Sequence, residues 1–527
     1  MLINAVPLLA PLILLVAAFY PRLLVGTTVR LGALIAECGA LAAMAVAAVS
    51  AVLLALQGSG DSPLFGVAGI GLSVRLDIVS VVMLLLVSFI GWIVVRYART
   101  YLDGEAEQAR FSFWLLLTLG AVLLLVQSGN VVQFVTAWIV TSLSLHRLLL
   151  FYPGRVAAQR AARKKYIVAR VGELAVVAAA VLLTLAYGTT EISAILAAAS
   201  AGQGGGLALA AAAFIALGAI LKSAQFPSHG WLTEVMEAPT PVSALLHAGV
   251  VNAGGFALIR FADVMLLSPL VLALLVLVGG FTAVFGGLVM LTQPTVKASL
   301  AWSTIGQMGF MILQCGLALF PLALLHIVAH SLYKAHAFLS AGSAVENVVA
   351  IRKPGPVAVP NLGAVGRAFV VALAIYAAVY AALGIGFDFG GKSPQAVALG
   401  AILIFGVAYL LAQGFADAAP KALTQRTAGY AAVVTVSYLV LQRASEWLTA
   451  GTLPATPTAG PLEWALILLA LVSFGLIALA QATLPLWAYH PAARGLRVHL
   501  SNGLYINAVT DRMLGGWTKP QGKGAAK

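Results

Sequence analysis

The chain has 527 residues, of which 61% are apolar and only 9% are charged. Soluble proteins average about 25% charged residues, so this composition excludes a water-soluble fold. The apolar residues form continuous runs of about 20, the length at which a helix crosses roughly 30 Å of hydrocarbon. Because these runs do not alternate with polar residues, they predict helices and not the strands of a barrel. We therefore predict an all-α, polytopic membrane helix bundle.

About fourteen to fifteen apolar segments are long enough to span a bilayer. They lie at residues 2–20, 30–56, 78–98, 111–127, 130–152, 166–187, 206–225, 240–260, 266–291, 297–317, 320–345, 366–385, 395–414, 427–447 and 462–486. The first segment has no basic region before it and no convincing cleavage site, so we read it as a retained helix and not as a signal peptide. The Gly-rich stretch 58–77 is expected to form an external hairpin.

The net charge of +13 follows from the distribution of basic residues and does not indicate nucleic acid. The first, third and fifth connections are basic, with clusters at 22–30, 96–110 and 155–165, whereas the second, fourth and sixth together hold only Arg75. Cytoplasmic loops carry the excess of Lys and Arg. We therefore expect the N-terminus outside and the C-terminus inside, with a membrane domain over 1–490 and a cytoplasmic tail over 491–527.

Ionisable side chains inside these runs cost roughly 2.5–3.5 kcal/mol each at a helix centre and mark ion pathways. Lys222 ends the seventh run, and Pro227 shortly after it predicts a helix break. His247 lies in the eighth run, and Glu173 lies in the sixth, after Arg170. Lysine, histidine and water in series are the parts of a proton relay.

The eleventh run carries three further ionisable side chains. His326, His330 and Lys334 are spaced i, i+4 and i+8, so they share one helix face. We also include Lys297, which follows a proline at the start of the tenth run, and Glu237, beside the turn before the eighth, in the predicted proton pathway.

Several of these residues have simpler readings. Lys222 could be one half of a structural ion pair, or could snorkel toward a membrane face. His326 and His330 could bind a metal, but no Cys, Asp or Glu nearby in sequence completes such a site, so we predict no metal and no cofactor in this chain. Glu234 and Glu237 could simply be solvated. His146 and Arg147, inside the fifth run, could snorkel or pair with Glu173.

Four segments resemble one known family. The stretch from Lys222, KSAQFP, continuing to APTPVSALLHA around His247, closely resembles the signature of proton-translocating antiporter-like subunits. These are the largest membrane-arm subunit of respiratory complex I, chain 5, and the large subunit of Mrp sodium/proton antiporters. Lys297–Met311 is similar to the family's tenth helix, His326–Ser343 to its eleventh and Arg170–Glu173 to its sixth.

The resemblance implies a bundle of about fourteen helices with two broken helices and inverted repeats. It also implies a proton route along the bilayer midplane through Lys222, His247 and Lys334, with an acidic partner that modulates Lys222. This sequence departs from the family at one telling position: where the family has a glutamate directly after the tryptophan of the fifth helix, Ile139 follows Trp138. Either Glu173 is the acidic partner of Lys222 instead, or proton transfer through Lys222 is coupled differently in this chain.

Neither the long lateral helix of the complex I subunit nor the extra domain of the Mrp subunit is predicted. The sub-branch that the chain resembles best is therefore the DabB subunits of inorganic carbon accumulation complexes. That resemblance implies a bacterial inner-membrane location and a DabA-like, zinc-containing, carbonic-anhydrase-like partner, with proton flow driving hydration of carbon dioxide to bicarbonate there. The chain itself is then a transporter subunit and not an enzyme, and its other contacts are lipid and protons.

Three other functions stay open at this point. A redox-driven pump subunit would depend on a redox partner, and a sodium/proton antiporter subunit would respond to sodium. A non-conducting assembly scaffold would tolerate loss of Lys222.

Overall fold

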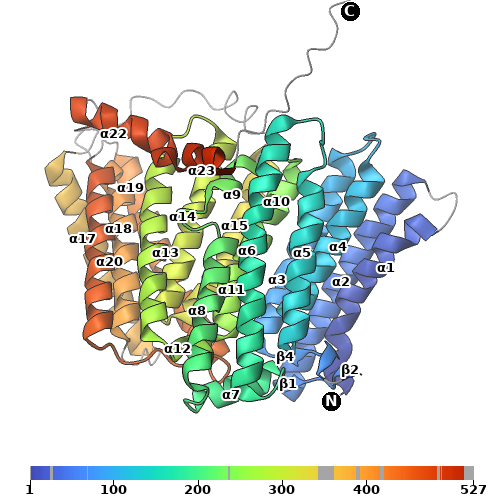
Figure 1. Ribbon diagram of the computed structural model, residues 1–527. Helices are drawn as coiled ribbons and strands as arrows, with labels where there is room; N and C mark the ends of the chain where they lie inside the picture. Colours follow the sequence, from blue (N-terminus) through green and yellow to red (C-terminus); the bar gives the residue numbers. More distant parts are fainter. Residues whose placement is uncertain are drawn as a thin grey trace, which may run out of the picture.

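The computed structural model describes residues 2–23, 28–67, 69–235, 238–341, 361–386, 392–415, 421–483, 487 and 490–514. Its long helices stand side by side in one bundle, and the chain crosses this bundle from α1 on one flank to α20 on the other (Figure 1). In this described part, twelve helices are long and apolar enough to cross a membrane. The predicted all-α membrane helix bundle is confirmed.

The helices up to the first break occupy the N-terminal flank. They are η1 Leu2–Leu8, α1 Leu9–Leu23, α2 Val29–Gln57, α3 Ile78–Tyr101, α4 Gln108–Val126, α5 Val131–Leu149, α6 Val156–Tyr187, α7 Ile192–Ser200 and α8 Gly205–Lys222. The central helices are α9 Gly230–Glu234, α10 Thr240–Ala248, η3 Val250–Asn252, α11 Ala253–Arg260, α12 Ala262–Leu266, α13 Pro269–Met290, α14 Val296–Gly316 and α15 Phe320–Ser340. The last are α17 Leu362–Gly386, α18 Pro394–Gly414, α19 Lys421–Thr449, α20 Pro461–Ala482, α22 Pro491–Ser501, η5 Gly503–Tyr505 and α23 Ile506–Leu514.

The two ends of the bundle differ in their connections (Figure 1). One end carries the predicted hairpin, in which β1 Gly60–Asp61 pairs with β4 Arg75–Leu76, and β2 Phe65–Val67 with β3 Ile70–Leu72, both antiparallel. We call this end the hairpin face. The opposite end carries α22, α23 and the α3–α4 and α5–α6 connections, and we call it the basic face.

Two helix breaks lie in the centre of the bundle. The first is the break predicted at Pro227, because α8 ends at Lys222 and α9 begins only at Gly230. The position of the second was not predicted: the segment 240–260, expected as one helix, is interrupted at Gly249, whose φ of −121° and ψ of −77° are not helical. The chain then makes one 3-10 turn before α11 begins.

The sixth helix starts ten residues earlier than expected, at Val156 and not at 166. Sequence reasoning assigned the basic residues before 166 to a solvated loop because they lower the local hydropathy. In the structure, Lys164 and Lys165 are only 3% and 5% exposed. Assigning both lysines to a loop was therefore wrong, since they belong to the interior of the bundle.

Close approach of small residues joins α13 to α14. A Cβ atom on Gly286 would lie 2.7 Å from the backbone nitrogen of Gly306. A Cβ atom on Gly309 would lie 2.5 Å from the backbone nitrogen of Ala283. Glycine at these positions lets the two backbones touch, which is how helices pack tightly where no hydrophobic effect drives them together.

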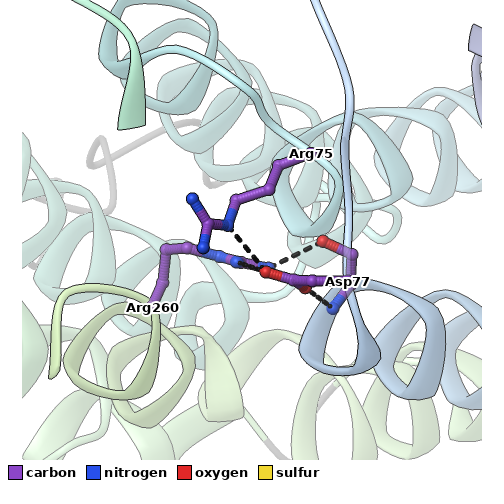
Figure 2. A network of polar contacts seen from close by, with 4 residues as sticks. Arg75, Asp77 and Arg260 are labelled. Carbon is purple, nitrogen blue, oxygen red and sulfur yellow. Dashed lines mark hydrogen bonds and ion pairs between the residues drawn. The ribbon is translucent and has the colours of Figure 1, made fainter. Parts of the chain in front are cut away.

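A buried ion-pair network ties the second broken helix to the N-terminal flank at the hairpin face (Figure 2). Arg260, the last residue of α11, donates two hydrogen bonds to the carboxylate of Asp77, at 2.5 and 3.2 Å. Arg75 donates a third, at 2.7 Å. Asp77 is also the N-cap of α3, where it accepts the backbone N–H of Ser80 at 2.8 Å. Asp77 and Arg260 are 2% and 4% exposed, so the pair is shielded from solvent.

The charge state of Asp77 depends on this network. Burial alone would raise the pKa of its carboxyl group, but the charge and hydrogen bonds of Arg260, the charge of Arg75 and the Ser80 N–H together hold that pKa well below its ordinary value. A depressed carboxyl pKa stabilises the fold above the unfolded-state value of about 3.9, and this contribution is lost as the pH falls toward the folded-state value.

We predict that Asp77→Asn destabilises the protein, because it leaves Arg260 buried without a counter-ion, a change that costs about 3–5 kcal/mol. Asparagine still caps a helix, so the loss reports on the ion pair and not on the cap. The measurement is the melting temperature of the detergent-solubilised protein against pH. The gap between wild type and variant should be wide at pH 7 and should shrink progressively as the pH falls below about 4; a gap that does not change with pH would contradict the network's role.

Candidate functional site

Lys222 ends α8 beside a small internal cavity. Its Nζ atom lies over the indole ring of Trp138 on α5, 4.9 Å from the ring centroid. The cavity has a volume of about 20 Å³ and is also lined by Ser142, Lys165 and Gly172. A space of this size holds one water molecule, for which at least about 10–15 Å³ is needed. We call this the lysine cavity.

Lys165 is the functional residue that sequence reasoning missed. Its Nζ atom donates to the Ser142 carbonyl at 2.6 Å and to the Ser142 hydroxyl at 3.1 Å. No carboxylate of the described residues lies within ion-pair distance of it, although Glu173 and Lys222 act on it electrostatically. A usable signal was present, since Ala158, Ala161 and Ala162 precede Lys165 at the spacing of a buried helix face.

Glu173 lies one residue beyond Gly172 on α6, and it is 6% exposed. Its carboxylate accepts a hydrogen bond from Arg170 at 2.5 Å. Both Glu173 and Arg170 act electrostatically on Lys222 without touching it. The proposed pairing of Glu173 with Arg147 is not formed, because the Arg147 guanidinium lies over the Trp114 ring, 5.8 Å from its centroid.

His247 and Lys334 are joined through the tenth-helix region, α14. Nδ1 of His247 is 3.1 Å from the hydroxyl oxygen of Thr304. Thr304 donates to the carbonyl of Leu300 at 3.0 Å, and Lys334 donates to the same carbonyl at 3.2 Å. His247 and Lys334 are each 0% exposed. His247 and Lys334, which the sequence singled out, are therefore close together in the structure. Thr304, which links them, was not singled out.

His330 and His326 continue this polar line along α15. Nε2 of His330 is 3.2 Å from the carbonyl oxygen of His247, and the two imidazole centroids of His330 and His326 are 5.9 Å apart. Nε2 of His247 and Nε2 of His326 are buried and have no hydrogen-bond partner among the described residues. Buried polar atoms of this kind are the ones that bind ordered water or exchange protons. We call His247, Thr304, His326, His330 and Lys334 the histidine cluster.

The helix break at Gly249 lies between the lysine cavity and the histidine cluster. Ser223, next to Lys222, donates to the carbonyl of Val251 at 3.0 Å. Asn252 donates to the hydroxyl of Ser331, beside His330, at 2.8 Å. Backbone groups freed by a break can be satisfied by such side chains and by water. The break thus supplies polar groups between two sites that would otherwise be separated by hydrocarbon.

Three other predicted or neighbouring residues lie apart from this line. Lys297 is partly exposed near the start of α14, at the basic face. Glu237 lies outside the described residues. Glu234 is not simply solvated, because it pairs with Lys164, which also binds Asp511 of α23 at 2.7 Å.

A second, half-buried lysine was not singled out from the sequence because Lys392 lies between two apolar runs. Lys392 donates to the side chains of Tyr376 and Gln442, at 3.4 and 3.2 Å. It lies beside a cavity of about 490 Å³ that also contains Glu446. The cavity is near the start of α18, beyond the histidine cluster along the chain.

The fold and the site together define a multi-pass membrane subunit with ionisable side chains aligned through its interior. A family model for the "NADH:quinone oxidoreductase/Mrp antiporter, TM" region matches residues 128–392, and one for the N-terminus of complex I chain 5 matches residues 65–112. The Mrp complex of Dietzia sp. has the same fold, with a TM-score of 0.66 at 24% identity, over 96% of this chain and 59% of that one.

Two relatives show to which branch of the antiporter-like subunits the chain belongs. The chain is 38% identical to the "Probable inorganic carbon transporter subunit DabB2" of Halothiobacillus neapolitanus, over 89% of this chain and 86% of that protein. It is 47% identical to the "Probable inorganic carbon transporter subunit DabB" of Hydrogenovibrio crunogenus, over 51% of this chain and 52% of that protein. The chain belongs to the DabB family of inorganic carbon transporter subunits, within the antiporter-like membrane subunits.

Adjacent lysines on α6 provide a matched test of this geometry. We predict that Lys165→Met leaves the melting temperature unchanged or raises it, because it removes a buried ammonium group that has no counter-ion. Lys164→Met should lower the melting temperature by several degrees, because it leaves Glu234 and Asp511 facing one another without their shared cation. Both are measured on the same detergent-solubilised preparation. Equal destabilisation by the two variants would show that Lys165 stabilises the fold as much as Lys164 does, and would contradict this prediction.

Proposed function

We propose that this chain is the proton-conducting membrane subunit of an inorganic carbon accumulation complex. The observation that carries the proposal is the lysine cavity, in which Lys222 and Lys165 share a water-sized space next to the buried Glu173. Ionisable groups are retained in the interior of a membrane protein at considerable cost, and such groups mark ion pathways. The polar side chains around Gly249 and the histidine cluster extend this pathway toward Lys334.

The chemistry of the cavity supports protons over sodium as the ion carried. Hard cations take oxygen ligands, mostly carboxylates and carbonyls. The lysine cavity presents two ammonium groups and no carboxylate in its lining, which would repel a sodium ion. Lysine and histidine side chains instead bind and release protons, and water between them completes a relay.

We further propose that proton flow through this chain drives one-way hydration of carbon dioxide to bicarbonate in a DabA-like partner. The names of the two curated relatives support a role in inorganic carbon transport. The chemistry itself would belong to a zinc-containing, carbonic-anhydrase-like partner. This chain would then be a transporter subunit without a catalytic site.

The orientation that fits this proposal places the basic face in the cytoplasm of a bacterial cell and the N-terminus outside. The basic connections at that face support it through the positive-inside rule. The helices α22 and α23 lie across the same face (Figure 1), so a cytoplasmic partner would meet them there.

The first test replaces the central lysines. In cells that need high carbon dioxide, the wild-type chain expressed with its partner should restore growth in air. We predict that Lys222→Ala and Lys334→Ala abolish this rescue and reduce proton uptake by about a hundredfold or more, the range of general acid–base effects. His247→Ala should have a milder effect. Lys421→Ala, at an exposed position at the start of α19, is the matched control and should behave as wild type.

Rescue by Lys222→Ala at the wild-type level would refute conduction through Lys222 and favour a scaffold. Uptake that requires sodium would point to an antiporter subunit. Purification of the complex from the native membrane should also recover a zinc protein; recovery of quinone-reductase subunits without one would reject the proposal.

A second test concerns the acidic partner of Lys222. We predict that Glu173→Gln lowers proton uptake by about tenfold or more, because it removes the negative charge that acts on both lysines of the cavity while keeping the side chain's shape. Proton uptake by membrane vesicles is the measurement. Wild-type uptake in this variant would show that another group controls Lys222.

A further inference from the structure

Three cavities follow one another along the interface between α5 and α6. The outermost, at the hairpin face, has a volume of about 480 Å³. Its lining is polar and includes Ser73, Asn130, Thr184 and two carboxylates, Asp61 and Glu191. We call it the mouth. Because it is wide and carries two acidic side chains, it admits water and attracts cations.

The innermost cavity is the lysine cavity. Between it and the mouth lies a middle cavity of only about 10 Å³, whose ten lining residues are all apolar. Phe134 and Phe261 meet edge to face there, with ring centroids 5.4 Å apart. Phe134 also contacts Trp138 of the lysine cavity, with ring centroids 5.9 Å apart.

The three cavities share one axis because the same helix faces line them. On α5, the order from mouth to lysine cavity is 130, then 131, 134 and 135, then 138, 142 and 145. On α6 it is 184, then 183, 180, 179 and 176, then 172, 169, 168 and 165. Steps of three and four residues keep each set on a single face. From 130 to 142 the helix rises by about 18 Å.

Two further helices contribute to both inner cavities. On α8, Ile215 lines the middle cavity and Lys222 the lysine cavity. Ala257 of α11 lines the middle cavity, and Val250, just before α11, lines the lysine cavity. The two inner cavities are therefore consecutive sections of one passage.

The middle cavity blocks this passage in the present structure. About 10–15 Å³ and two to four polar partners are needed to hold a water molecule, and the middle cavity offers no polar side chain. Protons move along hydrogen-bonded groups, so a dry apolar section interrupts them. Hydrophobic constrictions in channels gate in this way, by drying and wetting.

Resting on the proposed function, we propose that the α5–α6 interface is a proton route from the hairpin face to Lys222 and Lys165, closed by an apolar gate of Phe134, Val176 and Phe261. The gate controls access to the lysine pair from that face. Wetting of the middle cavity would connect the mouth to the lysine cavity without moving either helix as a whole.

The test makes the gate polar without changing its shape. Val176→Thr adds a hydroxyl group to the middle cavity, and Val181→Thr makes the same change on the outward side of α6, where the side chain is 53% exposed. Proton flux is measured in vesicles that contain the full complex, under an imposed pH gradient. We expect Val176→Thr to raise the flux by about tenfold or more and Val181→Thr to leave it unchanged. Adding Lys222→Met to Val176→Thr should remove the increase.

Each outcome has one meaning. Lys222-dependent flux that Val176→Thr leaves unchanged would refute the gate and leave the proposed function intact. An increase that survives Lys222→Met would show a leak elsewhere and also refute the route. If wild-type vesicles show no flux that depends on Lys222, the proposed function fails and this route fails with it.

A second measurement tests the sidedness of the mouth without using conduction. In a background with Cys38 and Cys315 replaced by serine, Thr184→Cys should react with a membrane-impermeant thiol reagent added at the hairpin face only. Leu183→Cys, in the middle cavity, should be protected from both faces. Labelling of Thr184→Cys from the basic face, or rapid labelling of Leu183→Cys, would overturn the proposed route.

Discussion

The structure depends on the cost of keeping ammonium groups inside a membrane domain. Lys222 and Lys165 share a cavity of about 20 Å³, and Glu173, the carboxylate that acts electrostatically on both, is already engaged by Arg170. Two positive charges in so small a space repel each other, so the proton on one lysine is coupled to the proton on the other. Lys222 and Lys165 would make a poor structural ion pair, because neither has an ion-pair partner of its own among the described residues.

Helix breaks explain how these groups can be buried at all. In an unbroken helix the backbone N–H and C=O groups bond to one another, so none is left to bind a charged neighbour. A break leaves carbonyl groups that accept hydrogen bonds from side chains. The interruption at Gly249 places Val251 and Asn252 within reach of Ser223 and Ser331. The Asp77–Arg260 pair fixes the far end of the same broken segment to α3 (Figure 2). A rigid anchor at one end and an irregular backbone at the other position the polar groups between Lys222 and His247.

The sequence predicted the residues whose chemistry contrasts with their surroundings. Lys222, His247 and Lys334 stand out in apolar runs, and Pro227 marks its own helix break. Lys165 was missed because four other basic residues precede it, and hydropathy cannot distinguish a solvated turn from a helix with one buried basic face. The break at Gly249 has no proline to signal it. The Asp77–Arg260 pair joins residues 183 positions apart. The sequence near either residue does not indicate this contact, because it forms only when the helices pack into the bundle.

The position after Trp138 is where this chain departs from the sequence pattern of the antiporter-like subunits that it resembles. The family resemblance implies a glutamate there, as the acidic partner of the central lysine. Ile139 removes that carboxylate, and Lys165 instead brings a second cation, held by the Ser142 carbonyl. In the proposed function, with an apolar section on one side of the cavity and the polar residues of the Gly249 break on the other, proton flow is controlled by access to the lysines and not by a fixed counter-ion.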